Sequence, residues 1–346
     1  MQEKIYISLS EIERFSKIML LHIGIDEKSA DIVTNALVNA NKRGVDSHGL
    51  LKLPGYLKRY QDMKWSKPEV IMDEGALGMV DGNNYIGFVN ATIGMKMAIR
   101  KARNFGIGMV GVRNSGHYGM ASHYSMMATE EQMIGWSFTN SAPLMAPWGG
   151  KRAMVGLNPW SYSVPYKKDF PIVLDISNSV VAQGKILMAS VKGTSIPLGW
   201  AMDKNGNQTT DPNVALDGLL CPLGEYKGYG ISAIIDILCG VLTGSHYLND
   251  VQLSSGPNPG TGHIFGAIDI SRFGSINEFQ ARLEDFVYRL KHTQKQPNVE
   301  EILVPGELEY KVSLSRIKEG VPIPTKLKKN LDEYALKFSE QPLQPI

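Results

Sequence analysis

The chain has 346 residues, of which 43% are hydrophobic and 20% are charged, as in an ordinary globular protein. One hydrophobic core rarely serves so long a chain, so we expect two domains. The formal net charge is +2, with 36 basic and 34 acidic residues interleaved, which argues against nucleic acid or an anionic membrane as a partner. The longest apolar stretch, residues 231–242, contains Asp236 and is too short to span a bilayer.

The cysteines of the chain, Cys221 and Cys239, both have apolar neighbours. We expect them to be buried free thiols in a reducing compartment rather than a disulfide. The N-terminal residues contain no apolar run of the kind that begins a secretion signal. These features predict a cytoplasmic protein.

The first part of the chain carries helical patterns. Ser8, followed three residues later by Glu11, has the spacing of a capping box at a helix start. Apolar residues recur at helical spacing over residues 26–40, and again over residues 51–62. These patterns predict a helical domain over residues 1–73.

From Glu74 onward, short apolar segments alternate with helical patterns. The segments with strand character are residues 107–112, 134–139, 162–164, 172–175 and 264–270. The helical patterns cover residues 87–104, 227–244 and 276–293. This alternation predicts an α/β domain over residues 74–296. The tail, residues 297–346, ends in a helical pattern near residues 327–337, and we expect it to join the helical domain.

Two stretches resemble known motifs but lack their context. Gly106, Gly108 and Gly111 match the glycine spacing of dinucleotide-binding loops, but that mechanism needs a strand, then the glycines, then a helix. Here the predicted helix comes first, so Gly106 is interpreted as a helix C-cap. Residues 203–207 begin like a calcium loop, yet glycine is missing at the sixth position and a carboxylate at the twelfth, which favours a hairpin turn. We expect no metal site.

Residues 43–49, Arg-Gly-Val-Asp-Ser-His-Gly, come just after the second helical pattern. The neighbouring glycine places His48 on a tight turn, and an imidazole titrates near neutral pH, so it can give or take a proton in a reaction. Taken alone, the motif is equally well explained by a surface histidine near a helix end.

Four further segments are polar, rich in glycine and flanked by apolar strands, a position where binding groups often lie. They are residues 114–119, 140–150, 156–159 and 224–230. In the first of them, we expect His117 to open a helix that follows a strand. In the last, Lys227 lies between Gly224 and Gly228 ahead of a helix, placed to present its ammonium group to a phosphate or a carboxylate.

With these segments in this order, the sequence resembles the type 2 malate/L-lactate dehydrogenases, whose relatives include ureidoglycolate, sulfolactate and diketogulonate dehydrogenases and reductases. The resemblance covers nearly the whole chain. It is carried by residues 43–49, 114–119, 143–150, 156–159, 174–177, 196–212, 222–230 and 304–307. It implies a non-Rossmann, mixed-sheet NAD(P)-binding domain with a smaller helical domain, as in the sulfolactate dehydrogenase-like fold. It also implies a homodimer with the site near the subunit contact.

The resemblance implies roles for individual residues. His48 matches the acid/base that moves the hydroxyl proton, and His117 matches a second active-site histidine. The substrate-binding positions are Ser47, Asn158 and Lys52, the last of which is commonly arginine in the family. Arginine grips a carboxylate at two points whereas lysine is a flexible point charge, so this difference bears on the choice of substrate. The nucleotide-contacting positions are Ser141, Asp175, Ile176, Ser177, Tyr226, Lys227, Gly306 and Glu307.

The implied function is the NAD(P)-dependent interconversion of a small 2-hydroxy acid and its 2-oxo acid, with malate first and lactate second. A ureidoglycolate-type dehydrogenase or a cyclic-imine-carboxylate reductase is the alternative on the same scaffold. A catalytically silent ligand-binding relative is the alternative outside enzymes. NAD is favoured over NADP, because the charge of Asp175 suits ribose hydroxyls better than a 2′-phosphate. The expected partner is thus a small-molecule acid.

Overall fold

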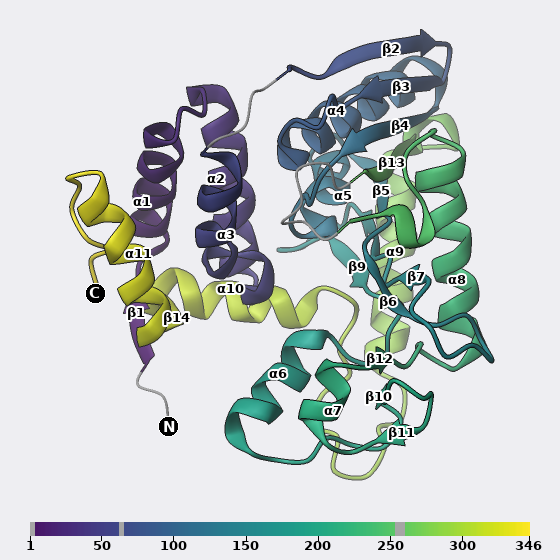
Figure 1. Ribbon diagram of the computed structural model, residues 1–346. Coiled ribbons are helices and arrows are strands. Elements are labelled where there is room, and N and C mark those ends of the chain that lie inside the picture. Colours follow the sequence, from purple (N-terminus) through teal and green to yellow (C-terminus); the bar gives the residue numbers. More distant parts are fainter. Residues whose placement is uncertain (1–3, 62–65, 253–259) are drawn as a thin grey trace.

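The computed structural model describes residues 4–61, 66–252 and 260–346. A group of helices that holds both ends of the chain stands beside a larger part built on a sheet (Figure 1). Within these three ranges, no helix is long and apolar enough to cross a membrane.

Helices from the two ends of the chain share one hydrophobic core. Ser8 caps the first helix by accepting a hydrogen bond from the backbone N–H of Glu11 at 3.1 Å, and Asp26 caps the second in the same way, so both predicted starts are confirmed. The apolar faces of the helices bury side chains such as Phe15, Leu37 and Leu331. The elements of this group are β1 (Lys4–Ile7), α1 (Leu9–His22), α2 (Glu27–Lys42), α3 (Leu53–Tyr60), β14 (Val321–Pro324) and α11 (Thr325–Lys337), with β1 and β14 paired antiparallel.

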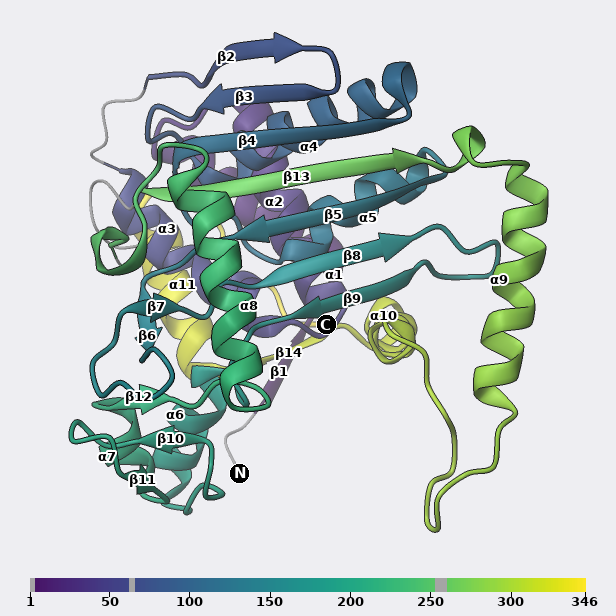
Figure 2. The ribbon, with the colours of Figure 1, turned by 90° about the vertical axis from the view of Figure 1, so that its right-hand side faces the viewer.

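The second part is a seven-stranded mixed sheet of order β2-β3-β4-β13-β5-β8-β9. Only β3 and β4 run parallel, so the sheet is not the parallel sheet of a Rossmann domain. Helices α4 and α5 cover one face and α8 crosses the other (Figure 2). The bounds are β2 (Glu69–Glu74), β3 (Leu77–Asp81), α4 (Gly87–Phe105), β4 (Ile107–Ser115), α5 (Ala121–Glu130), β5 (Met133–Thr139), β8 (Trp160–Val164), β9 (Ile172–Ile176), α8 (Tyr226–Asp236) and β13 (Thr261–Asp269).

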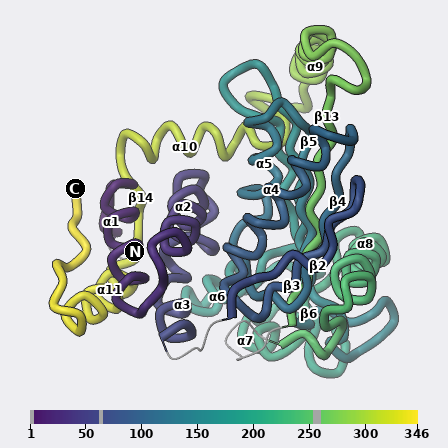
Figure 3. The backbone as a smooth tube through the Cα atoms, turned by 90° about the horizontal axis from the view of Figure 1, so that it is seen from above, coloured from purple at the N-terminus to yellow at the C-terminus, as the bar shows by residue number. Residues whose placement is uncertain are grey.

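Smaller elements surround the sheet. Two short strands flank the turn at residues 203–207 and pair antiparallel, which confirms the predicted hairpin. Helix α10 runs from the sheet part to the helical group (Figure 3). The bounds are β6 (Pro143–Met145), β7 (Val155–Gly156), α6 (Gln183–Lys192), β10 (Ala201–Met202), β11 (Gln208–Thr209), α7 (Pro212–Leu216), β12 (Leu219–Leu220), the π-helical turn η3 (Ile237–Val241), α9 (Ile276–Lys291) and α10 (Glu307–Glu319).

The structure tests several local predictions, of which some are confirmed and one is wrong. Gly106 ends α4 in the left-handed region with φ 85°, as a helix C-cap should. Cys221 and Cys239 are buried free thiols. The predicted start of a helix at His117 is wrong, because α5 begins only at Ala121 and His117 lies in the preceding loop. The pattern over residues 51–62 corresponds to the end of a 3-10 turn, η2 (Leu50–Lys52), and to α3, and Asp62 lies outside the described residues.

The predicted domain limits at residues 73 and 296 stay a prediction. The core of the helical group takes in Tyr85, Ile86, Phe88 and Val89, from the start of α4, so hydrophobic packing continues across the first of these limits.

Two buried histidines predict that acid destabilises the protein. His263 has no exposed surface and lies between Thr139 and Ser115, with ring nitrogens 2.8 and 2.9 Å from their hydroxyl oxygens. Burial lowers the pKa of His263 to about 3 and that of His123 to about 4, both from 6.5. Because the unfolded chain takes up these protons first, their stabilising contribution is complete above pH 6.5 and is lost as the pH falls toward the folded pKa.

We therefore expect the free energy of unfolding to fall on the order of 1 kcal/mol per pH unit for each of these histidines between about pH 6 and pH 4. Urea unfolding at a series of pH values measures this slope. The variant His263→Gln keeps a donor and an acceptor but cannot titrate, and its slope should be smaller by about one proton. Equal slopes in the two proteins would show that His263 does not contribute.

Candidate active site

His48 lies on a short 3-10 turn, η1 (Asp46–His48), that follows α2. The side chain of Asn41 holds this turn. Its amide nitrogen donates to the carboxylate of Asp46 at 2.8 Å, and its oxygen accepts from the backbone N–H two residues after His48 at 2.7 Å. Gly49 passes so near that a Cβ there would lie 2.3 Å from the Asn41 side-chain oxygen, so the close approach requires glycine. The half-buried His48 therefore stands on a fixed turn.

Arg316 of α10 holds the same turn from the other side. Its two terminal nitrogens donate to the two carboxylate oxygens of Asp46 at 2.5 and 2.8 Å, and one of them also donates to the backbone carbonyl of Asn41. A planar guanidinium matches a carboxylate at two points and fixes its orientation. The sequence analysis found neither Asn41 nor Arg316, and no local pattern pairs Arg316 with a residue 270 positions away.

The structure brings the predicted catalytic residues together. The imidazole rings of His48 and His117 stack with centroids 5.6 Å apart. The hydroxyl of Tyr56 lies 2.6 Å from Nδ1 of His117, and the backbone N–H of Gly119 donates to the same nitrogen at 3.3 Å. Burial raises the pKa of Tyr56, so its hydroxyl keeps its proton and donates it. Nδ1 of His117 is thus an acceptor, and the ring hydrogen sits on Nε2, where it can be donated to a substrate oxygen.

Lys52 lies near both imidazoles. Burial is the main cause that lowers the pKa of His48 to about 4, and the charge of Lys52 lowers it further. The same two causes hold the pKa of His117 well below its usual value, together with the charge of His48. The expectation of a proton donor with a pKa near neutral is wrong, because burial and the charge of Lys52 lower the pKa of both rings and leave them neutral at pH 7. Lys52 is exposed and forms no ion pair with any residue in the described ranges, which leaves its ammonium group for an anion.

The predicted nucleotide contacts Asp175, Ile176 and Ser177 lie where β9 ends. The carboxylate of Asp175 accepts a hydrogen bond at 2.8 Å from the backbone N–H of Ser122, in the first turn of α5. Burial raises the pKa of Asp175, partly offset by that hydrogen bond. The end of β9 and the start of α5 are thereby joined. The hydroxyl of Ser47, a predicted substrate contact, lies 2.9 Å from Nδ1 of His48.

Asn158 is fully buried, and its side chain is already used inside the protein. Its oxygen accepts from the backbone N–H of Ser141 at 2.9 Å, and its nitrogen donates to the carbonyl of Ser232 at 2.9 Å. Asn158 therefore holds the loop that carries Ser141. Its assignment as a substrate contact stays a prediction.

Tyr226 and Lys227 begin α8 and are both exposed. The close approach of this helix depends on Gly228, where a Cβ would lie 2.5 Å from the carbonyl oxygen of Asn178. Lys227 has no ion pair with any residue that the structure describes. Its charge is therefore available to a ligand in this part of the protein.

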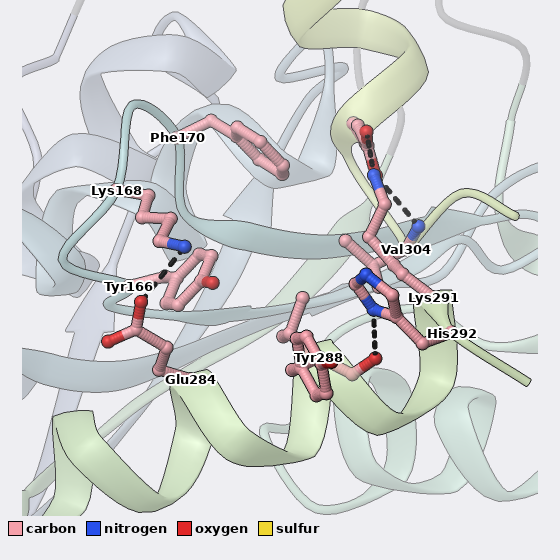
Figure 4. A pocket seen from close by; sticks show the side chains of 10 residues that line it. Tyr166, Lys168, Phe170, Glu284, Tyr288, Lys291, His292 and Val304 are labelled. Atoms are coloured by element: carbon pink, nitrogen blue, oxygen red, sulfur yellow. Dashed lines mark hydrogen bonds and ion pairs between the residues drawn. The ribbon is translucent and has the colours of Figure 1, made fainter. Parts of the chain in front are cut away.

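Gly306 and Glu307 lie at the start of α10, and Glu307 is already paired. Its carboxylate contacts the ammonium groups of Lys291 and Lys311 and accepts a hydrogen bond from the backbone N–H of Val304 at 3.1 Å. A cavity of about 270 Å³ opens beside this ion cluster (Figure 4). Its lining includes Tyr166, Phe170, Tyr288 and His292 but none of His48, His117 or Lys52. This cavity is thus not the histidine site.

The site combines two imidazole rings, which can exchange a proton, with the ammonium group of Lys52, which can bind an anion. His117 lies in the loop after β4, a strand of a mixed sheet outside the Rossmann class. A profile of the malate/L-lactate dehydrogenase family matches residues 7–332. The malate/(S)-sulfolactate dehydrogenase of Methanothermus fervidus is 38% identical over 331 residues, 94% of this chain and 96% of that protein. The solved malate dehydrogenase of Entamoeba histolytica has a TM-score of 0.94 at 32% identity and covers 98% of this chain and 99% of its own. The protein belongs to the malate/L-lactate dehydrogenase family, a family of oxidoreductases.

Two further relatives carry a cofactor in their names. The (2R)-3-sulfolactate dehydrogenase (NADP(+)) of Chromohalobacter salexigens is 35% identical, over 84% of this chain and 90% of that protein. The ureidoglycolate dehydrogenase (NAD(+)) of Escherichia coli O157:H7 is 31% identical, over 92% of each. The relatives of this chain therefore include dehydrogenases named for NAD(+) and dehydrogenases named for NADP(+). The match to solved dehydrogenases confirms the predicted mixed-sheet fold class.

Proposed function

We propose that the protein is an NAD(P)-dependent oxidoreductase that interconverts a 2-hydroxy acid and its 2-oxo acid, with malate and oxaloacetate as its first substrates and lactate and pyruvate as its second. The observation that carries the proposal is the stacked pair of His48 and His117 with the unpaired ammonium group of Lys52 beside it. Malate is placed first because the relative from Methanothermus fervidus is named for malate and sulfolactate, which both carry a second acidic group.

The residues suggest a division of work. A bound nicotinamide supplies or accepts the hydride. Lys52 binds the substrate carboxylate. In the oxidation direction, the neutral ring of His48 accepts the hydroxyl proton, and Nε2–H of His117 donates a hydrogen bond to the same oxygen.

In the reduction direction, His48 must first take up a proton. Two causes lower the pKa of His48, burial and the charge of Lys52. A substrate carboxylate bound to Lys52 offsets the second cause, because it places a negative charge nearby. Substrate binding therefore raises the pKa of His48 and prepares it to protonate the carbonyl oxygen.

The test follows the absorbance of the reduced nicotinamide with a panel of acids. Oxaloacetate should be reduced fastest and pyruvate more slowly. A preference for a ureidoglycolate-type substrate or for a cyclic imine carboxylate would show that the protein is instead a ureidoglycolate-type dehydrogenase or a cyclic-imine-carboxylate reductase. Binding of an acid without turnover of any panel member would mark a catalytically silent relative.

For the cofactor, we propose NAD rather than NADP. Support comes from Asp175 at the end of β9, whose negative charge suits ribose hydroxyls and opposes a 2′-phosphate. A second carboxylate, that of Glu309 in the first turn of α10, interacts with Asp175 and adds to this charge. The ratio of kcat/KM for NADH to that for NADPH measures the preference, and a ratio below one would overturn it.

We propose that the protein acts as a homodimer in the cytoplasm. A row of apolar side chains on α8, on η3 and on the residue after η3 is exposed in the single chain and would be covered at a subunit contact: Ile234, Ile237, Val241 and Leu242. Light scattering of the purified protein gives its mass, and a monomer at micromolar concentration would contradict the dimer.

Lys227→Ala should weaken the binding of the dinucleotide roughly tenfold or more, because a charge-assisted contact is lost. The melting temperature without ligand should hardly change, since Lys227 is exposed and has no ion pair within the described residues. Fluorescence titration with NADH measures the binding. Lys192→Ala, at an exposed lysine in the last turn of α6, is the control. Unchanged NADH affinity would remove Lys227 from the cofactor site.

A further inference from the structure

Arg43, the C-cap residue of α2, has a buried guanidinium group that makes no hydrogen bond or ion pair within the described residues. It is 8% exposed, and its Nε is buried without a hydrogen bond. A buried unpaired charge is costly, and buried polar groups in proteins almost always have a partner. Arg43 therefore calls for a ligand that the chain itself does not supply.

The surroundings of Arg43 come from four elements. The charges that act on it are those of Glu309, in the first turn of α10, and Asp175, at the end of β9. Asp175 in turn receives the hydrogen bond from the first turn of α5. The neighbouring Gly44 lies against Val312 of α10, where a Cβ would be 3.0 Å from a methyl group. Arg43 thus lies at the end of α2, close to the end of β9 and to the first turn of α10.

The charges that act on Arg43 differ from the charge that acts on the two histidines. Lys52 acts on both His48 and His117, whereas Glu309 and Asp175 act on Arg43. The residues beside Arg43 include Asp175, one of the proposed nucleotide contacts.

We infer that Arg43 binds a phosphate group of the dinucleotide. The inference rests on the proposed function, which requires a dinucleotide. A guanidinium offers a planar pair of donors that matches phosphate oxygens, and the start of α5 adds the positive end of a helix dipole. The two carboxylates offset the charge of Arg43 and oppose a further phosphate on the ribose, which agrees with the proposed preference for NAD.

The test compares ligands that differ only in phosphate. In Arg43→Met, the affinity for ADP and for NADH should fall roughly ten- to a hundredfold, while the affinity for adenosine changes less than about threefold. Calorimetry gives the first two constants, and ligand-observed NMR gives the third. Arg43→Lys, which keeps the charge but loses the two-point geometry, should lie between wild type and Arg43→Met. Arg103→Met, at an exposed arginine paired with Glu131, is the control and should bind all three ligands normally.

The outcomes separate this inference from the proposed function. If wild type and Arg43→Met bind ADP equally, Arg43 does not contact a phosphate, although the protein still uses a dinucleotide. If the affinities of Arg43→Met for adenosine and for ADP fall by the same factor, Arg43 supports the local fold instead. If wild type binds neither NADH nor NADPH, both proposals fail. Should Arg43→Met not fold, an unchanged ADP affinity in Arg43→Lys overturns the inference and a weakened one supports it.

Discussion

Replacing His48 by asparagine should lower kcat roughly a hundredfold or more while the dissociation constant of NADH stays nearly unchanged. Asparagine keeps a polar side chain on the turn but cannot exchange a proton with the substrate. The turn itself is held by Asn41, Asp46 and Arg316, so the substitution should leave its backbone in place. Steady-state kinetics and a fluorescence titration with NADH measure the two quantities separately.

A surface histidine provides the control for this variant. His22 lies on α1, away from the site, and pairs with Glu340 at 2.8 Å. The kcat of His22→Asn should therefore equal that of the wild type. Near-normal turnover in His48→Asn would transfer the acid–base role to His117 or to a bound water.

Lys52→Ala should raise the KM for 2-oxo acids by about ten- to a hundredfold, the loss of roughly 1.5–3 kcal/mol from a charge-assisted hydrogen bond. Cofactor binding should change far less. Since the charge of Lys52 is one cause of the low pKa of His48, that pKa should also rise in the variant. The pH dependence of kcat/KM, or an NMR titration of the ring, detects the rise.

Substitutions at neighbouring charges sharpen this test. Lys52→Arg keeps the charge but changes its reach and geometry, so it should alter the preference among oxo acids. Lys58→Ala removes an exposed lysine of α3 and should leave the kinetics unchanged. If Lys52→Ala and Lys52→Arg both behave like Lys58→Ala, Lys52 is a solvated surface lysine and the substrate carboxylate has another partner.

Local chemistry explains which parts of the fold could be predicted. Ser8 and Asp26 cap helices with their own side chains, and Gly106 ends one because glycine accepts a positive φ, so each signal lies within a few residues of its effect. Helix α10 was missed for the opposite reason. Over residues 308–314 apolar and polar residues alternate one by one, which is the spacing of a strand and not of a helix.

The candidate site was predictable only in part. The resemblance pointed to His48, His117 and Lys52, and the structure gathers them. Their protonation state depends on burial and on the charge of Lys52, neither of which a motif contains. The hydrogen bonds from Tyr56 to His117 and from Arg316 to Asp46 join residues 61 and 270 positions apart, so they appear only in the folded chain.

The transfer of a labelled hydride tests the central claim most directly. The protein is incubated with NADH that carries deuterium on the transferred position of the nicotinamide, together with oxaloacetate or pyruvate, and the product is analysed by mass spectrometry and NMR. The account predicts a 2-hydroxy acid with one deuterium on C2, and the oxygen-bound proton coming from solvent through His48. Oxidation of NADH without deuterium on C2, or no oxidation with any 2-oxo acid, would contradict it.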